Sequence, residues 1–143
     1  MTKGYVQAVG AVALVLAGYF AGRAAAPATV QAQQGTRVYE LRTYAAPDAE
    51  KFAMLNARFR EHTTRLFEKH GMTNIGYWTP VDSPTTLIYI VAHQSMEAAK
   101  KSWAAFGADT DWQKVRADTT AKGLTGIKVE SKYLQPTDYS TLK

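Results

Sequence analysis

The sequence predicts an α+β domain in which strands and helices follow the order β-α-β-β-α-β. Four short segments alternate and are rich in aromatic and β-branched residues, two longer segments carry apolar residues at helical spacing, and Gly- or Pro-containing turns separate them. Elements in this order form the ferredoxin-like arrangement, a four-stranded antiparallel sheet with both helices on one face. We expect this domain to occupy residues 37–143.

The first half of the domain is predicted to be a strand, a helix and a second strand. Residues 37–44 (RVYELRTY) alternate and suit a strand. Pro47 is expected to begin a helix at its first turn. The negative charges of Asp48 and Glu50 would interact favourably there with the positive end of the helix dipole. The apolar face of this helix comprises Phe52, Leu55, Phe59, His62 and Leu66. Gly71 ends the helix, and residues 72–79 form the second strand.

The second half is predicted to be a strand, an interrupted helix and a last strand. Residues 85–93 pair with 72–79 as a hairpin through the turn 80–84. Ser95 caps a helix that Gly107 interrupts and Asp109 restarts, with Gly123 at its end. Residues 126–134 alternate again as the last strand, and a tail follows from Pro136.

The first 36 residues are predicted to precede the domain. Lys3 is followed by 19 uncharged, mostly apolar residues, 4–22, and then by Arg23. This pattern is typical of a secretory signal peptide, and it is nearly long enough to remain as a membrane anchor. We therefore expect residues 1–23 to be a signal peptide or an anchor, residues 24–36 to be a flexible linker, and the domain to be exported, as a periplasmic or secreted protein.

Composition excludes several classes of function. The formal net charge is +5, but the basic residues are scattered among acidic ones, whereas nucleic-acid binding needs them on one surface. The absence of cysteine excludes a disulfide framework and a thiol nucleophile. Phosphate-binding glycine loops, nucleophile elbows and metalloprotease motifs are also absent from the sequence.

The strand pattern predicts a dimer. Alternation places Tyr39, Leu41, Ile75, Tyr77, Ile88, Ile90, Ile127 and Val129 on the side that the helices cover. The other side then carries Val38, Glu40, Arg42, Tyr44, Trp78, Leu87, Tyr89, Val91, His93, Lys128 and Glu130. No helix remains for this second, partly aromatic face, so we expect a second copy of the chain to cover it and to enclose a polar-lined cavity between two sheets.

Five residues of that face are the predicted ligand-binding set: Glu40, Arg42, Trp78, Tyr89 and Glu130. Glu40 and Arg42 point into the enclosed space, where charges must be paired or bound to a polar ligand. The alternative is that they form a structural ion pair that fixes the register of the dimer. Trp78 and Tyr89 offer aromatic surfaces for stacking.

Two histidines are the candidates for acid–base catalysis. His62 lies on the expected apolar face of the first helix, and His93 ends a strand. A core histidine with a hydrogen-bonded ring is the alternative for His62. No second histidine stands at metal-ligand spacing, so no metal site is predicted.

Several separated motifs resemble the NIPSNAP family. They are VYELRTY on the first strand, RFREHTTRLFEKHGM along the first helix, GYW on the second strand and SWAAFGADTDWQKVRA across the second helix. The resemblance covers residues 37–143 and implies a dimeric α/β-barrel. The wider superfamily of that fold includes cofactor-free monooxygenases, haem-using enzymes and binding proteins, so the fold alone does not decide among them.

Three functions follow as alternatives. The first is binding of a small organic molecule in the dimer cavity. The second is a cofactor-free or haem-using monooxygenase or isomerase in which His62 or His93 moves a proton. The third is a scaffold whose outer helices recruit partners. The sequence leaves any cofactor unidentified.

Overall fold

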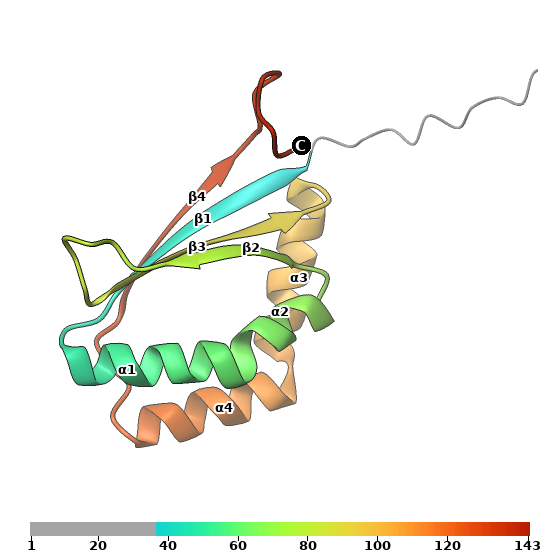
Figure 1. Cartoon of the computed structure of the whole chain (residues 1–143). Helices are drawn as coiled ribbons and strands as arrows, with labels where there is room; N and C mark the ends of the chain where they lie inside the picture. Colours follow the sequence, from blue (N-terminus) through green and yellow to red (C-terminus); the bar gives the residue numbers. More distant parts are fainter. Residues whose placement is uncertain (1–36) are drawn as a thin grey trace, which may run out of the picture. The chain divides into compact units, whose positions relative to one another are not determined.

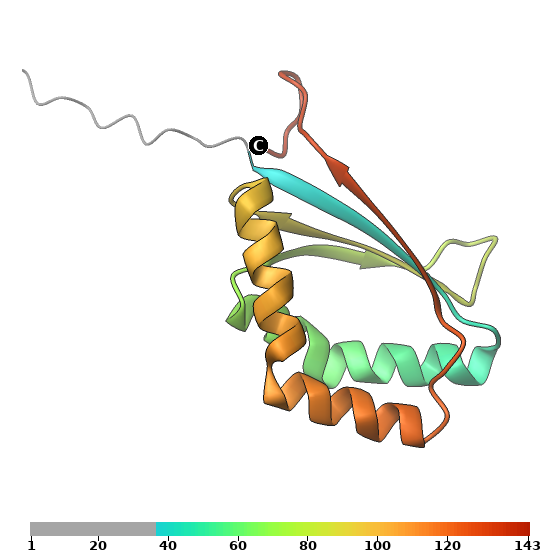
Figure 2. The same ribbon diagram turned by 180° about the vertical axis from the view of Figure 1, so that it is seen from behind.

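A computed structural model of the chain describes residues 37–143. The expected leader, 1–23, and linker, 24–36, lie outside the described residues. Four strands form one antiparallel sheet in the order β2-β3-β1-β4. Their bounds are β1 Val38–Ala45, β2 Thr73–Trp78, β3 Thr86–His93 and β4 Lys128–Leu134. The helices lie on one face of the sheet, as Figures 1 and 2 show from opposite sides, and the ferredoxin-like prediction is confirmed.

The first helical segment is continuous but contains a π-turn. It comprises α1 (Ala49–Arg58), the π-helical η1 (Phe59–Thr63) and α2 (Thr64–Lys69). Asp48, rather than Pro47, begins it, because the Asp48 carboxylate accepts a hydrogen bond from the Lys51 backbone amide at 2.8 Å. In η1 the Thr64 amide bonds to the Phe59 carbonyl, which adds one residue to the turn.

The π-turn changes which side chains face the sheet. Phe59 and Thr63 are both buried, whereas the His62 side chain is 40% exposed. The prediction that His62 belongs to the apolar face is therefore wrong. The extra residue in the turn rotates the helix surface, so regular 3.6-residue spacing does not hold across this segment.

The second helical segment breaks at Asp109. It consists of α3 (Met96–Ala108), capped by Ser95 as predicted, and α4 (Thr110–Ala121). The expected interruption at Gly107 lies two residues too early, because α3 continues through it. The buried Asp109 carboxylate accepts hydrogen bonds from the backbone amides of Asp111 and Trp112 and so begins α4.

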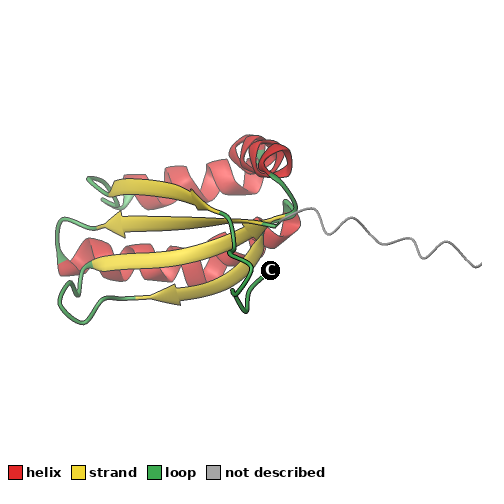
Figure 3. Ribbon diagram, turned by 90° about the horizontal axis from the view of Figure 1, so that it is seen from above, coloured by secondary structure: helices red, strands yellow, loops and turns green. Residues whose placement is uncertain are grey.

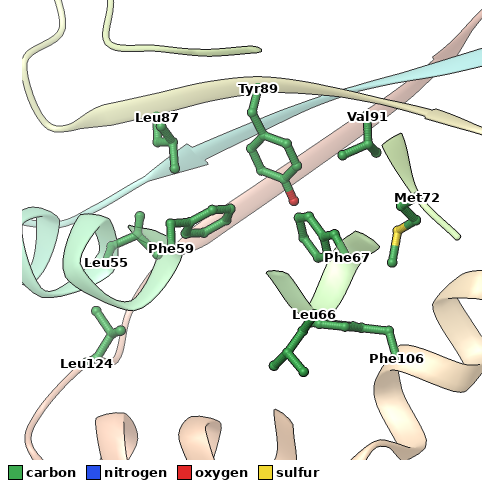
Figure 4. Packing of buried hydrophobic residues seen from close by; sticks show 10 residues of the cluster. All are labelled: Leu55, Phe59, Leu66, Phe67, Met72, Leu87, Tyr89, Val91, Phe106 and Leu124. Carbon is green, nitrogen blue, oxygen red and sulfur yellow. The ribbon is translucent and has the colours of Figure 1, made fainter. Parts of the chain in front are cut away.

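The core lies between the sheet and the helices (Figure 4). Leu87, Tyr89 and Val91 extend from β3 toward the helices. Phe59 and Phe67 meet the Tyr89 ring, with centroids 5.2 Å and 5.9 Å away. The Phe59 ring meets Tyr89 edge to face and the Phe67 ring is stacked with it, and both arrangements add to the free energy gained from burying the rings.

The predicted face assignment is wrong for β1 and β3. Glu40, Arg42, Tyr89 and His93 lie on the helix-covered side, because Tyr89 belongs to the core and stands opposite Arg42 across the strand pair. Tyr77 of β2 also lies on this side, as predicted, since it pairs with Tyr89. Period-2 alternation separates the two sides of one strand but does not say how the sides of different strands match.

The opposite side of the sheet, which we call the open face, is not covered by any described helix (Figure 3). It carries Tyr39, Leu41, Trp78, Ile88, Ile90, Glu130, Lys132 and Leu134. Trp78 is 51% exposed. The open face is thus more apolar than predicted. Of the predicted ligand-binding residues, it carries Trp78 and Glu130. Within residues 37–143, no helix has the length and apolarity to cross a bilayer.

Candidate functional site

Glu40 is the centre of a buried polar cluster beneath the helices. Its residue is 1% exposed. One carboxylate oxygen, Oε1, accepts hydrogen bonds from Arg42 at 2.6 Å and Ser131 at 2.7 Å. The other, Oε2, accepts one from the Trp103 indole at 2.6 Å and lies 3.2 Å from His93 Nε2. The carboxylate is fully engaged by protein groups.

These contacts decide the protonation state of Glu40. Burial alone would raise its pKa, but the hydrogen bonds from His93, Ser131, Trp103 and Arg42 outweigh burial and lower the pKa from 4.5 to about 2. Glu40 is therefore an anion at neutral pH, and the predicted ion pair with Arg42 exists inside one chain. It joins β1 to β4 and α3 rather than one sheet to a second sheet.

Arg42 connects this cluster to a tyrosine pair. Its guanidinium lies 4.5 Å from the centroid of the Trp103 ring and donates a 3.3 Å hydrogen bond to the Tyr44 hydroxyl. Although burial opposes its charge, the nearby Tyr89 and Tyr44 hydroxyls and the Glu40 carboxylate raise the pKa of Arg42. Arg42 is thus a permanent cation held beside Tyr44.

The Tyr44 hydroxyl has a hydrogen atom to donate. Its oxygen accepts from Arg42 and from the Tyr89 hydroxyl, each at 3.3 Å. A phenol oxygen that accepts two hydrogen bonds still carries its own O–H, which must point toward a third group. Donation to the Tyr44 oxygen also polarises this O–H, so Tyr44 is a strengthened donor.

Tyr44 borders a pocket of about 460 Å³ between β4 and α4. Its walls include Tyr44, Arg58, Trp112, Arg116, Ile127 and Val129. The pocket exists because the helices leave β4 uncovered: all seven residues of that strand are exposed. Its volume is in the range of sites that bind small organic molecules.

Arg58 enters this pocket from the end of α1. Its guanidinium lies 5.2 Å from the Trp112 ring centroid, and its Nη1 lies 3.5 Å from the Thr119 hydroxyl. The buried Nε has no hydrogen-bond partner. Arg116 lies at the exposed rim, so two cations and the Tyr44 hydroxyl meet in one pocket with aromatic and aliphatic walls.

The structure divides the predicted site residues among three places. Glu40, Arg42, Tyr89 and His93 form the buried cluster described above. Trp78 and Glu130 lie on the open face. His62 borders a separate groove of about 560 Å³ between η1 and α4. None of these seven residues lines the pocket, although Arg42 and Tyr89 both contact Tyr44.

The sequence reasoning missed the residues that line the pocket. The strand pattern correctly predicts that Tyr44 shares a face with Glu40 and Arg42, but it places that face away from the helices, and it gives neither Tyr44 nor Arg58 a role. One signal was present: Arg58 precedes Phe59, so an arginine adjoins a core position. Trp112 stands at a helical core position, where an aromatic residue is ordinarily packing rather than a binding surface.

The described domain therefore defines a class: a ferredoxin-like α+β protein with a polar cluster and a pocket between its helices and its sheet. The NIPSNAP family model matches residues 39–141. The chain belongs to the NIPSNAP family, and the resemblance seen in its motifs is confirmed. No curated protein matches the sequence significantly.

Solved structures share this fold. A NIPSNAP family protein from Agrobacterium tumefaciens, described as having unknown function, superposes with a TM-score of 0.65 at 20% identity, covering 76% of this chain and 96% of its own. A NIPSNAP-like domain protein from Burkholderia xenovorans gives 0.63 at 17% identity, with 74% and 90% covered. At these identities the likeness shows the fold alone.

The fold also occurs in oxygenases. A monooxygenase from Streptomyces coelicolor, in complex with the ligand nanaomycin D, superposes with a TM-score of 0.53 at 16% identity, covering 73% of this chain and 91% of its own. A mutant of SnoaB from Streptomyces nogalater, a cofactor-independent oxygenase, gives 0.51 at 16% identity, with 75% and 97% covered. The ferredoxin-like fold is thus shared by family members and oxygenases.

Proposed function

We propose that this chain binds a small organic molecule with an oxygen acceptor in the pocket between β4 and α4. The observation that carries the proposal is Tyr44, a residue that lines the pocket and whose hydroxyl accepts two hydrogen bonds and keeps its own O–H to donate. Trp112, Ile127 and Val129 supply apolar walls. A combination of directed polar groups and apolar walls is typical of small-molecule sites.

This proposal places the ligand differently from the sequence-based one. Binding was expected between two sheets, with Glu40 and Arg42 touching the ligand. Because Glu40 is saturated by four protein groups, its role in the proposal is to hold Arg42, and Arg42 in turn orients Tyr44. The ligand touches Tyr44, and each chain carries a complete site.

The test is a comparison of wild type with Tyr44→Phe. We use 2-naphthamide as the probe, since it has an aromatic body and a carbonyl acceptor, and measure its affinity by titration calorimetry. Losing one neutral hydrogen bond is expected to weaken binding roughly two- to tenfold. Tyr139→Phe is the matched control, because Tyr139 is 85% exposed, and its affinity should equal that of wild type. Equal affinities in all three proteins would refute the role of Tyr44.

The same probe separates binding from the scaffold alternative. A molecule that binds only the folded state raises the unfolding temperature, by an amount that grows with its concentration. A scaffold without a site would show no such rise with any small aromatic compound.

An oxygenase is the second candidate function. Two proteins of this fold are described as an oxygenase and a monooxygenase. A polarised Tyr44 donor would also stabilise negative charge developing on a bound carbonyl oxygen. Among the described residues no histidine lines the pocket, so an enzyme here would use Tyr44 in place of His62 or His93.

We also propose that the open face pairs with a second copy of the chain. Its apolar side chains include Leu41, Ile88 and Ile90, and β4 adds Glu130 and Lys132, which carry opposite charges. A two-fold axis can set Glu130 of one chain against Lys132 of its partner and bury the apolar area of both. The oppositely charged pair favours a second copy as the partner.

Ile90→Lys tests this pairing. It places a charge on the open face, beside the C-terminal tail, so we expect a dimer for wild type and a monomer for Ile90→Lys in sedimentation velocity. Val81→Lys is the matched control, since Val81 lies fully exposed in the β2–β3 turn and should leave the dimer intact. A wild-type monomer at micromolar concentration would contradict the proposal. We further propose that the domain is exported behind residues 1–23.

A further inference from the structure

We infer that the ligand of this pocket is a planar aromatic acid, and that Arg58 recognises its negative charge. The inference rests on the small-molecule binding proposed above and adds the charge and shape of the ligand. Two arginines enter the interior, Arg42 from β1 and Arg58 from α1.

Arg42 and Arg58 are treated differently by the fold. Arg42 lies 2.6 Å from the Glu40 carboxylate, so its charge is balanced within the protein. The Arg58 guanidinium lies beside the Thr119 hydroxyl and the Trp112 ring. The Nε atoms of both arginines lack a hydrogen-bond partner, so the difference between them is the counter-ion. Within residues 37–143, no carboxylate forms a salt bridge with Arg58. A half-buried cation without a counter-ion is costly, and a bound anion would remove that cost.

The surroundings of Arg58 strengthen this argument. Burial lowers the pKa of Arg58, and the positive charge of Arg116 acts in the same direction. Arg116 lines the same pocket and likewise forms no salt bridge with any described residue. Two unneutralised guanidinium groups therefore face one space together with the Tyr44 donor. Guanidinium groups and a phenol O–H are the donors that suit a carboxylate.

The walls indicate the shape of the ligand. The Trp112 ring, already beside the Arg58 guanidinium, and the Tyr44 ring give flat surfaces, while Ile127 and Val129 give aliphatic ones. A planar aromatic body fits such walls, and a pocket of about 460 Å³ accommodates two fused rings.

The neighbouring groove does not offer the same selectivity. Arg58 also borders the groove that contains His62, and charges of both signs line it: Glu61, Asp111 and Asp118 against Arg65, Lys114 and Lys122. The three carboxylates of that groove repel an anion that approaches Arg58 from that side. The pocket has no acidic residue among its lining residues, so the preference belongs there.

The test compares 2-naphthoate with 2-naphthamide, its neutral isostere, by titration calorimetry on the purified full-length chain. We expect wild type to bind the carboxylate roughly tenfold to a hundredfold more tightly, as hydrogen bonds to charged groups are the stronger ones. Arg58→Met should abolish this preference while leaving amide binding within about threefold, since the amide needs only the Tyr44 donor and the apolar walls. Arg60→Met is the matched control, because Arg60 is exposed on the adjacent turn, and it should keep the preference.

The unfolding temperature supplies a second readout. If Arg58 serves a ligand, removing its uncompensated charge leaves the ligand-free protein as stable as wild type or more stable. Should Arg58→Met not fold, Arg116→Gln at the exposed rim serves instead, and it should reduce the preference several-fold.

The outcomes are distinguishable. Equal affinity for both probes overturns the charge inference and leaves the binding proposal standing. If Arg58→Met keeps the preference for the carboxylate, whether or not it is destabilised, the assignment to Arg58 is overturned. Failure of both probes to bind at millimolar concentration overturns the proposed function as well.

Discussion

Replacing Glu40 by Ala is expected to lower the free energy of unfolding by about 3–5 kcal/mol. The substitution leaves the Arg42 guanidinium buried without its 2.6 Å counter-ion and removes an acceptor from Ser131 and Trp103. Breaking a buried pair from one side is more costly than the pair itself is stabilising, since the remaining charge must then be accommodated alone. Urea unfolding followed by far-UV circular dichroism measures the change.

Glu130→Ala is the matched control for Glu40→Ala. Glu130 lies in the same sheet but on the open face, it is exposed, and it carries no salt bridge within residues 37–143. With both substitutions made in the Ile90→Lys background, which is expected to be monomeric, removal of Glu130 should change stability by less than about 0.5 kcal/mol. A loss below about 1 kcal/mol for Glu40→Ala would show that Arg42 finds another partner or water.

The same carboxylate gives the protein an acid-dependent stability. The folded-state pKa of Glu40, about 2, lies below its ordinary value of 4.5, so folding favours the ionised form. Its contribution is complete above pH 4.5 and is lost as the pH falls from 4.5 toward 2, amounting to roughly 3 kcal/mol. Glu40→Gln should flatten the stability curve in this window, which urea titrations at successive pH values would reveal.

Phe67→Ala is expected to lower the free energy of unfolding by about 3–5 kcal/mol. Phe67 is 1% exposed, and its ring centroid lies 5.0 Å from Phe106, 5.3 Å from Trp103 and 5.9 Å from Tyr89. It thus links β3 to the helices α2 and α3. Truncation removes these contacts and leaves a cavity that rigid aromatic neighbours cannot fill.

Denaturant unfolding compares Phe67→Ala with two controls. Phe67→Leu retains most of the volume and should lose clearly less stability than Phe67→Ala. Tyr139→Ala removes an exposed ring from the C-terminal tail and should be nearly neutral. Similar losses for Phe67→Ala and Tyr139→Ala would contradict the placement of Phe67 at the centre of the core.

The order of elements followed from the sequence because each has a local signal. The strands alternate, Ser95 caps α3, and Asp109 restarts the second helix as α4. The π-turn η1 has no comparable signal, because it adds a residue without any change in composition. His62 was misplaced for that reason, since the π-turn buries Thr63 in its stead, whereas Leu55, Phe59 and Leu66 are buried as predicted.

The site was harder to predict than the fold, because matching the sides of different strands depends on register. Both alternating sets of β3 are apolar, Leu87, Tyr89 and Val91 against Ile88 and Ile90, so hydrophobicity does not say which set the helices cover. An irregularity in β2 between Asn74 and Gly76 further shifts the pairing with β3. Glu40 and Arg42 share a face, as predicted. That face lies under the helices, whereas the prediction placed it on the uncovered side.

The location of the ligand is the central claim, and a crystal structure of the complex with 2-naphthoate tests it most directly. We predict one molecule in each chain between β4 and α4, with its carboxylate at the Tyr44 hydroxyl and the Arg58 guanidinium and its rings beside Trp112. A molecule found instead between the open faces of two chains, against Trp78, would contradict this account.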